Sequence, residues 1–452
     1  MAKKATTRNR ASLEAVLRRL NPNVPAGQTG DAIPRIPRDS TALRQIRAHL
    51  GADPFAKMLL TGHIGVGKST ELLHFAREME ANRWVIQCSV ASTLGVHNVN
   101  TFSLLVVLLE ASIRSWVKRL GEISPGLVGG LVDLVRKLVP EETRPAKLTP
   151  LHRIQKELLE QVDARALLAG KPTLRIVDTG WALLNLYDEI LQRLALRSVS
   201  VEQAGALDPS PLALSCELIL KELENEAGKP VLLVIDDLDK VRSEEARDDV
   251  FLNRAMAWLR LPCGIVSTLP LDALFSSRGR ELDEVWFDVQ VLDPLPVPAA
   301  DGGTLDDPAL QPYLSILRSV GAEGVLSALQ CRRLANASSG LPRTFVSACS
   351  ACVAYAVEAD EVHVRDYHVD LVLRDIADRW RGRLDDSDYR ALIDVLDSEG
   401  SNVPRAISLL RDGILVRDGT APPERQFRLA SWAEPLVEAY RRRMLRKQST
   451  PS

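Results

Sequence analysis

The sequence predicts an α/β fold: a parallel sheet that carries a glycine-rich loop, followed by helical segments and a smaller C-terminal domain. Three observations lead to this prediction. A short apolar strand at residues 57–61 runs directly into the glycine-rich loop and then into a helical pattern. A continuous apolar run at residues 230–235 ends in acidic residues, which is typical of a buried parallel strand. Helical patterns then dominate until two short strand patterns near residues 414–429.

Length and composition are those of a multidomain globular protein. The chain has 452 residues, and domains usually have about 100–200 residues, so two or three domains are expected. Hydrophobic residues make up 46% of the chain, which allows a sizeable core. The formal net charge of −2 excludes a strongly basic coat for nucleic acid. Residues 1–20 and 441–447 are locally basic; they either touch nucleic acid or acidic lipid, or are simply solvated.

The cysteines and the apolar segments favour a reduced, cytoplasmic location. The six cysteines are scattered, and the N-terminus lacks the apolar segment of a signal peptide. Cys349 and Cys352 share one helical face, but no second pair lies at zinc spacing, so we expect them in the core. No apolar run reaches the ~18–20 residues that a membrane span needs.

Residues 62–70 match the phosphate-binding motif G-x-x-x-x-G-K-[ST] in full. They are Gly62, His63, Ile64, Gly65, Val66, Gly67, Lys68, Ser69 and Thr70. The glycines let the backbone fold into a ring whose N–H groups point at phosphates. Lys68 then reaches the β- and γ-phosphates, and the Ser69 hydroxyl becomes a Mg²⁺ ligand. The helix that follows adds the positive end of its dipole.

The apolar run at residues 230–235 supplies the acidic partner of this loop. We expect Asp236 to hold Mg²⁺, largely through its waters. Asp237 is a candidate to orient or deprotonate the attacking water. The alternative is a buried strand that ends in solvated acids. Asp239 is expected to be a surface or capping residue.

A third strand pattern, residues 263–268, ends in two hydroxyl residues. Thr268 or Ser267 is a candidate to touch the γ-phosphate or the attacking water. The alternative is that they only begin a loop.

The nucleotide is expected to be ATP or ADP, because the chain has neither the base-reading motif of guanine-specific proteins nor a transporter signature. The segment from Ser338 to Arg343, Ser-Ser-Gly-Leu-Pro-Arg, opens a helix downstream. Together with the phosphate-loop and acidic-strand motifs, this pattern resembles the AAA+ and STAND ATPases, particularly the initiator clade related to origin-recognition proteins. The resemblance covers about residues 31–100 and 205–440.

The resemblance implies roles for further residues. Arg343 would contact the nucleotide from a helical lid, the sensor-2 role. Arg38 would begin the family's Arg-Glu helix beside the adenine, with Asp39 in place of the usual glutamate. Arg278 and Arg280 lie where the family places an arginine finger for the neighbouring subunit's γ-phosphate, which implies a homo-oligomer. Solvated loop arginines are the equal alternative.

Two departures from the family pattern matter. Asp237 stands where vigorous motors carry glutamate, so hydrolysis is expected to be slow. The interval between Lys68 and Asp236 exceeds the family norm, and the excess at residues 112–204 is predicted to be a helical insertion.

The end of the chain looks like a winged-helix domain. The expected elements are a helix at 388–396, a helix at 403–411, strands at 414–417 and 426–429, and a last helix at 432–440. Its candidate DNA contacts are Arg405, Arg411, Arg417 and Arg425. This basic set is thin, so contact with DNA and contact with a protein partner both stay open.

The sequence therefore predicts an ATP-driven switch or remodeller. The predicted segments are 1–30 (basic), 31–300 (ATPase core), 301–382 (lid), 383–445 (winged-helix-like) and 446–452 (tail). A non-hydrolysing, ATP-gated interaction module is the alternative from a different class. A third hypothesis is a nucleotide or small-molecule kinase. It is weaker, because the sequence shows no signature of a pocket for the phosphate acceptor.

Overall fold

The computed structural model describes residues 12–23, 26, 35–36, 38, 40–91, 99–120, 209–298, 306–398, 407–417 and 427–449. All statements below concern these residues. The helical insertion predicted at residues 112–204 falls on them only up to residue 120. Asp39 also lies outside them.

The centre of the molecule is a five-stranded parallel sheet in the order β2-β3-β4-β1-β5. The strands are β1 (Lys57–Thr61), β2 (Trp84–Ser89), β3 (Val231–Asp236), β4 (Gly264–Thr268) and β5 (Asp288–Val291). In register, Leu60 lies opposite Thr268, and Ser89 lies opposite Asp236. The predicted parallel-sheet core is thus confirmed. Because the strands are parallel, all their carboxyl ends meet at one edge.

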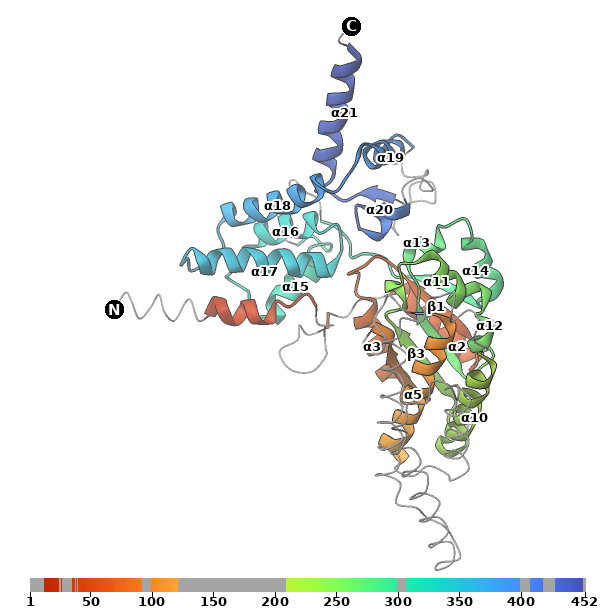
Figure 1. Cartoon of the computed structure of the whole chain (residues 1–452). Coiled ribbons are helices and arrows are strands. Elements are labelled where there is room, and N and C mark those ends of the chain that lie inside the picture. Colours follow the sequence, from red (N-terminus) through yellow and green to blue (C-terminus); the bar gives the residue numbers. More distant parts are fainter. Residues whose placement is uncertain are drawn as a thin grey trace, which may run out of the picture.

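Helices cover both faces of the sheet (Figure 1). Along β3, Leu233 and Ile235 pack into one apolar cluster, and Leu232 and Val234 pack into another on the opposite face. This arrangement explains why β3 reads as a continuous apolar run. The helical segments of the core are α2 (Thr41–Ala52), α3 (Lys68–Met79), α5 (Thr101–Leu120), α10 (Ser210–Ala227), η2 (Leu238–Lys240), α11 (Glu244–Asp248), η3 (Asp249–Asn253), α12 (Met256–Leu259), α13 (Leu271–Leu274) and α14 (Gly279–Val285).

The segment that the sequence predicts to be the lid is a separate helical layer with its own apolar cluster, and we keep the name lid for it. Its helices are α15 (Gln311–Ser319), α16 (Ala328–Ala337), α17 (Pro342–Glu358) and α18 (Asp366–Arg381). Cys349 and Cys352 are fully buried in this cluster, so their predicted place in the core is confirmed. The helix at residues 12–19 buries Leu13 and Val16 in the same cluster, so this part of the N-terminal segment is not simply solvated.

The C-terminal domain has the predicted helix–helix–strand–strand–helix order. Its elements are α19 (Asp386–Asp397), α20 (Ile407–Arg411), β6 (Leu415–Arg417), β7 (Phe427–Leu429) and α21 (Glu434–Ser449). β6 and β7 are antiparallel. Tyr389 stacks on Tyr440 with ring centroids 4.6 Å apart and so joins α19 to α21. α21 is longer than predicted and projects away from the rest of the molecule (Figure 1).

Of the helices in the described ranges, none is long and apolar enough to cross a membrane.

Candidate nucleotide-binding site

The phosphate loop lies between β1 and α3, at the carboxyl edge of the sheet. Gly62, Gly65 and Gly67 have φ angles of 149°, 83° and 105°, in the region that favours glycine. A Cβ atom at Gly62 would lie 2.6 Å from the Leu292 carbonyl oxygen, and one at Gly65 would lie 2.8 Å from Arg343 Cβ. The loop is therefore wedged between the end of the sheet and the lid, and only glycine fits at these two positions.

The N-terminus of α3 offers its backbone N–H groups to an anion. Gly67 caps this helix, so the cap residue has no side chain that could accept a hydrogen bond from its first turn. Uncapped N–H groups and the helix dipole together favour phosphate at such a position. The loop thus fits the phosphate group that its motif predicts.

The Lys68 ammonium is buried and has three acceptors. It donates to the carbonyl oxygens of Gly62 at 2.7 Å and His63 at 3.0 Å. It also pairs with Asp239 Oδ2 at 2.8 Å, and the two side chains are only 4% and 10% exposed. The prediction that Asp239 is a surface or capping residue is therefore wrong. A phosphate has to compete with this carboxylate for the lysine.

Ser69 and Asp236, the two predicted Mg²⁺ ligands, are in contact. Asp236 ends β3 and accepts hydrogen bonds from the Ser69 hydroxyl and, at 2.8 Å, from the Asp237 N–H. Burial raises the pKa of Asp236, while the bond from Ser69 lowers it. A carboxylate and a hydroxyl side by side are oxygen donors of the kind that Mg²⁺ prefers, so the residues present fit this ion.

Asp237 and Thr268 are fixed by neighbours within the chain. Asp237 has a φ of 73°, and its carboxylate accepts hydrogen bonds from Ser89 Oγ and Lys240 Nζ. Thr268 is fully buried, and its Oγ1 accepts from the Asp239 N–H at 3.3 Å. The structure thus links Thr268 to the site through the backbone of Asp239.

Ser267, the other hydroxyl candidate, donates to the Thr268 carbonyl oxygen at 3.3 Å and is fully buried.

Arg343 lies against the phosphate loop, and its contact with a nucleotide stays a prediction. Its backbone N–H donates to the Gly65 carbonyl at 3.1 Å, and its Nε donates to the Pro22 carbonyl at 3.2 Å. The N-terminal segment and the lid therefore meet above the loop.

Arg38 lines the same site, beside two residues that the sequence reasoning missed. Arg38 lies 3.8 Å from Glu71, and Arg35 donates to Glu71 at 2.8 Å. Burial lowers the pKa of Arg38. Its Nε and Nη2 atoms have no hydrogen-bond partner within the described chain. No motif marks Glu71 and Arg35, because their contact joins the N-terminal segment to α3.

A pocket of about 170 Å³ is lined by many of these residues, though Asp236, Asp237 and Thr268 are not among its lining residues. Its lining includes the phosphate loop, Arg38, Arg343, Asp239 and the apolar side chains of Ile36, Leu295, Ile316 and Val346. Its volume is smaller than the ~300 Å³ of typical small-molecule sites, and Pro22 and Arg343, which are hydrogen-bonded to each other, both line it. A larger cleft of about 950 Å³ lies between the lid and the C-terminal domain. That cleft includes no residue of the phosphate loop, so the smaller pocket is the candidate nucleotide site.

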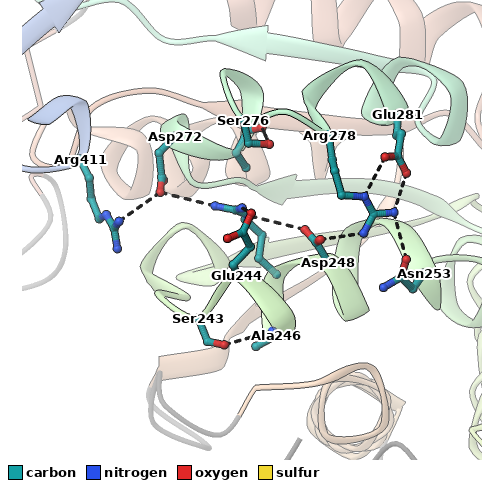
Figure 2. A network of polar contacts seen from close by, with 12 residues as sticks. Ser243, Glu244, Ala246, Asp248, Asn253, Asp272, Ser276, Arg278, Glu281 and Arg411 are labelled. Atoms are coloured by element: carbon teal, nitrogen blue, oxygen red, sulfur yellow. Dashed lines mark hydrogen bonds and ion pairs between the residues drawn. The ribbon is translucent and has the colours of Figure 1, made fainter. Parts of the chain in front are cut away.

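Arg278 and Arg280 have different surroundings. Figure 2 shows Arg278 held by Glu281, Asp248 and Asn253 of its own chain, with the closest contact to Glu281 at 2.5 Å and the next to Asp248 at 2.7 Å. These hydrogen bonds raise its pKa. Every end of its guanidinium is engaged, which favours a structural role over the arginine-finger role. Arg280 is exposed and makes no ion pair with the described residues, so it stays the candidate finger.

His63, the first variable residue of the motif, contacts the C-terminal domain. Its imidazole is 1% exposed. Nδ1 lies 3.3 Å from the Leu410 carbonyl oxygen, and Nε2 accepts the Arg417 N–H at 2.8 Å. Burial, the largest cause, lowers the pKa of His63 to about 3. The motif alone cannot predict these contacts, because the partners lie more than 340 residues away in sequence.

Comparisons with known proteins give weak likenesses only. No protein-family model and no curated protein sequence matches the chain. Among solved structures, the chain is similar to Drosophila ORC bound to DNA, with 12% identity, a TM-score of 0.38 and coverage of 95% of this chain and 92% of that chain. It is also similar to Cdc6p from Pyrobaculum aerophilum, with 12% identity, a TM-score of 0.38 and coverage of 94% and 98%.

A third likeness is to RuvB from Thermotoga maritima, a Holliday junction branch migration motor, with 13% identity, a TM-score of 0.33 and coverage of 88% and 93%. These values do not assign a family or an activity. The assignment of a P-loop α/β fold rests on the strand order and on the geometry of the phosphate loop.

Replacing Asp239 by asparagine should strengthen ATP binding. The substitution removes the charge that competes with phosphate for Lys68 but keeps the shape of the side chain. We expect the affinity for Mg·ATP to rise about tenfold, or ~1.4 kcal/mol, in a titration with a fluorescent ATP analogue. Asp248→Asn, which removes an acid outside the pocket, is the matched control. Unchanged or weaker binding by Asp239→Asn would contradict the competition.

His63 should make the fold sensitive to acid. Its folded pKa, about 3, lies below the ordinary value of 6.5, so the unfolded chain takes up this proton at higher pH than the native chain. The free energy of unfolding should therefore fall by up to about 1.4 kcal/mol for each pH unit below 6.5, with no effect above it. Urea unfolding of wild type and His63→Gln at pH 7.5, 6 and 5 measures this difference. Parallel pH profiles of the two proteins would refute it.

Proposed function

We propose that the chain is an AAA+-type ATPase that uses Mg·ATP as a switch, with slow hydrolysis. The observation that carries the proposal is the meeting of Lys68, Ser69 and Asp236 at the carboxyl edge of the sheet, under Arg343 of the lid. In this proposal residues 31–300 are the ATPase core, 301–382 the lid and 383–445 the output domain.

The roles follow from the contacts. Lys68 and the N–H groups of the loop bind the phosphates, and Ser69 and Asp236 hold the metal. Mg²⁺, when bound, offsets the negative charge on the phosphate oxygens. Asp237 orients the attacking water, with its carboxylate positioned by Ser89 and Lys240.

The partner contacts of Asp237 also support the second candidate, a non-hydrolysing ATP-gated module. A carboxylate already engaged by a lysine and a serine is a weaker acceptor for a proton from water. Asp237→Asn separates the two functions. A hydrolase loses turnover and keeps ATP binding, whereas a gate shows negligible turnover before the substitution.

The oligomer and its output are part of the same proposal. In this proposal the exposed Arg280 is the arginine finger that contacts the γ-phosphate bound by a neighbouring subunit. Arg411 and Arg417, two of the candidate DNA contacts, pair instead with Asp272 at 3.5 Å and Asp293 at 2.8 Å of the ATPase core. DNA contact through them requires these pairs to open, so we favour a protein partner while the domain is docked.

The decisive experiment is ATP turnover of wild type beside Lys68→Ala, with and without double-stranded DNA. We expect Lys68→Ala to lower turnover on the order of 100-fold, because it removes a buried donor to the phosphates. A wild-type rate unaffected by DNA supports the protein-contact output, and a rate that rises with DNA supports a DNA-driven motor. Equal turnover by wild type and Lys68→Ala would overturn the proposed site.

A further inference from the structure

The residue that follows the first glycine of the phosphate loop contacts two parts of the protein at once. The His63 carbonyl oxygen accepts a hydrogen bond from Lys68 Nζ at 3.0 Å. Its imidazole lies between the Leu410 carbonyl oxygen at 3.3 Å and the Arg417 N–H at 2.8 Å. Leu410 belongs to α20 and Arg417 to β6, so one residue connects the phosphate-binding lysine to the C-terminal domain.

The contacts of the imidazole fix its protonation. Because Nε2 accepts the Arg417 N–H, it carries no proton, and the proton resides on Nδ1 and is donated to the Leu410 carbonyl. Both nitrogens of the neutral ring are thereby satisfied in a position that is 1% exposed. Separation of the C-terminal domain from the loop would break both of these hydrogen bonds and exchange them for bonds to water. The loop and the domain therefore keep one relative arrangement as long as this contact persists.

Other contacts also dock the C-terminal domain on the core, but at a distance from the phosphates. Arg411 pairs with Asp272 on α13, as Figure 2 shows. Phe275 and Phe427 pack edge to face, with centroids 5.0 Å apart. None of these residues lies in the phosphate loop. His63 differs from them because its own backbone holds Lys68.

We propose that His63 is a positioning residue that couples phosphate binding to the docking of the C-terminal domain. The inference rests on the proposed nucleotide site. Phosphate draws the Lys68 ammonium away from its in-chain acceptors, among them the His63 carbonyl. The imidazole transmits the resulting shift of the loop to α20 and β6. By linkage, docking of the domain in turn changes the affinity for nucleotide by the same factor.

Substitutions at His63 separate the hydrogen bond to the Leu410 carbonyl from the hydrogen bond to the Arg417 N–H. Asparagine places an amide N–H near the position of Nδ1 and keeps the bond to Leu410. Glutamine reaches the Arg417 N–H with its side-chain oxygen. Alanine removes both bonds. Arg417→Ala is the matched control, because it removes the ion pair with Asp293 but keeps the backbone N–H that His63 accepts.

The test is hydrogen–deuterium exchange of the full-length chain with and without Mg·ATPγS. The readout is the amide exchange rate in residues 407–417 and 427–437, and binding of Mg·ATPγS is measured in parallel. In wild type we expect Mg·ATPγS to change exchange in these segments by threefold or more. His63→Ala should bind Mg·ATPγS and lose this response, and the asparagine and glutamine variants should retain part of it. Arg417→Ala should exchange faster throughout and keep the nucleotide response.

Two results would overturn the inference alone. One is a His63→Ala response as large as that of wild type, and the other is wild-type binding of Mg·ATPγS without any change in these segments. Failure of wild type to bind Mg·ATPγS would instead refute the proposed nucleotide site, and the inference with it. The asparagine and glutamine variants keep a polar group in the buried position and decide the question if His63→Ala does not fold: a response as large as that of wild type in both overturns the inference.

Discussion

The ion pair between Lys68 and Asp239 is the interaction on which the rest of the site depends. It joins the start of α3 to the segment that follows β3, and it therefore requires β1 and β3 to end at the same edge of the sheet. Thr268, at the end of the strand between them, holds the backbone of Asp239 in place. A buried ammonium without a counter-ion would be strongly unfavourable, so the pair stabilises the loop. A bound phosphate would also have to displace Asp239 from the Lys68 ammonium.

Three parts of the chain converge on this loop. The loop belongs to the core, and the lid places Arg343 against Gly65. The C-terminal domain donates a hydrogen bond from the Arg417 N–H to His63. Gly65 and His63, the loop residues in these two contacts, both lie close to the position that the phosphates would occupy. On the proposed account, a change at the phosphates therefore reaches the lid and the C-terminal domain directly, through residues of the loop itself. The acidic and basic side chains are mostly paired with one another, and the imidazole bonds to backbone groups, which explains how a buried and highly charged site can exist in a stable fold.

Local patterns in the sequence predicted the parallel core, the phosphate loop and the order of elements in the C-terminal domain. These features depend on spacings of a few residues, such as the glycines before Lys68 or the apolar run before Asp236. The roles of Asp239, Glu71 and His63 could not be read in this way, because their partners come from distant segments. Arg278 shows the converse: its position left an arginine finger and a solvated loop arginine equally open, but the acids that engage it belong to α11 and α14.

The most direct test of the account is the separation of Lys68 Nζ and Asp239 Oδ2 in a crystal structure with bound Mg·ATPγS. In the present structure it is 2.8 Å. We expect the pair to be broken, with Lys68 on phosphate oxygens and Ser69 and Asp236 around the metal. A nucleotide bound elsewhere, such as in the cleft between the lid and the C-terminal domain, with the Lys68–Asp239 pair intact, would contradict it.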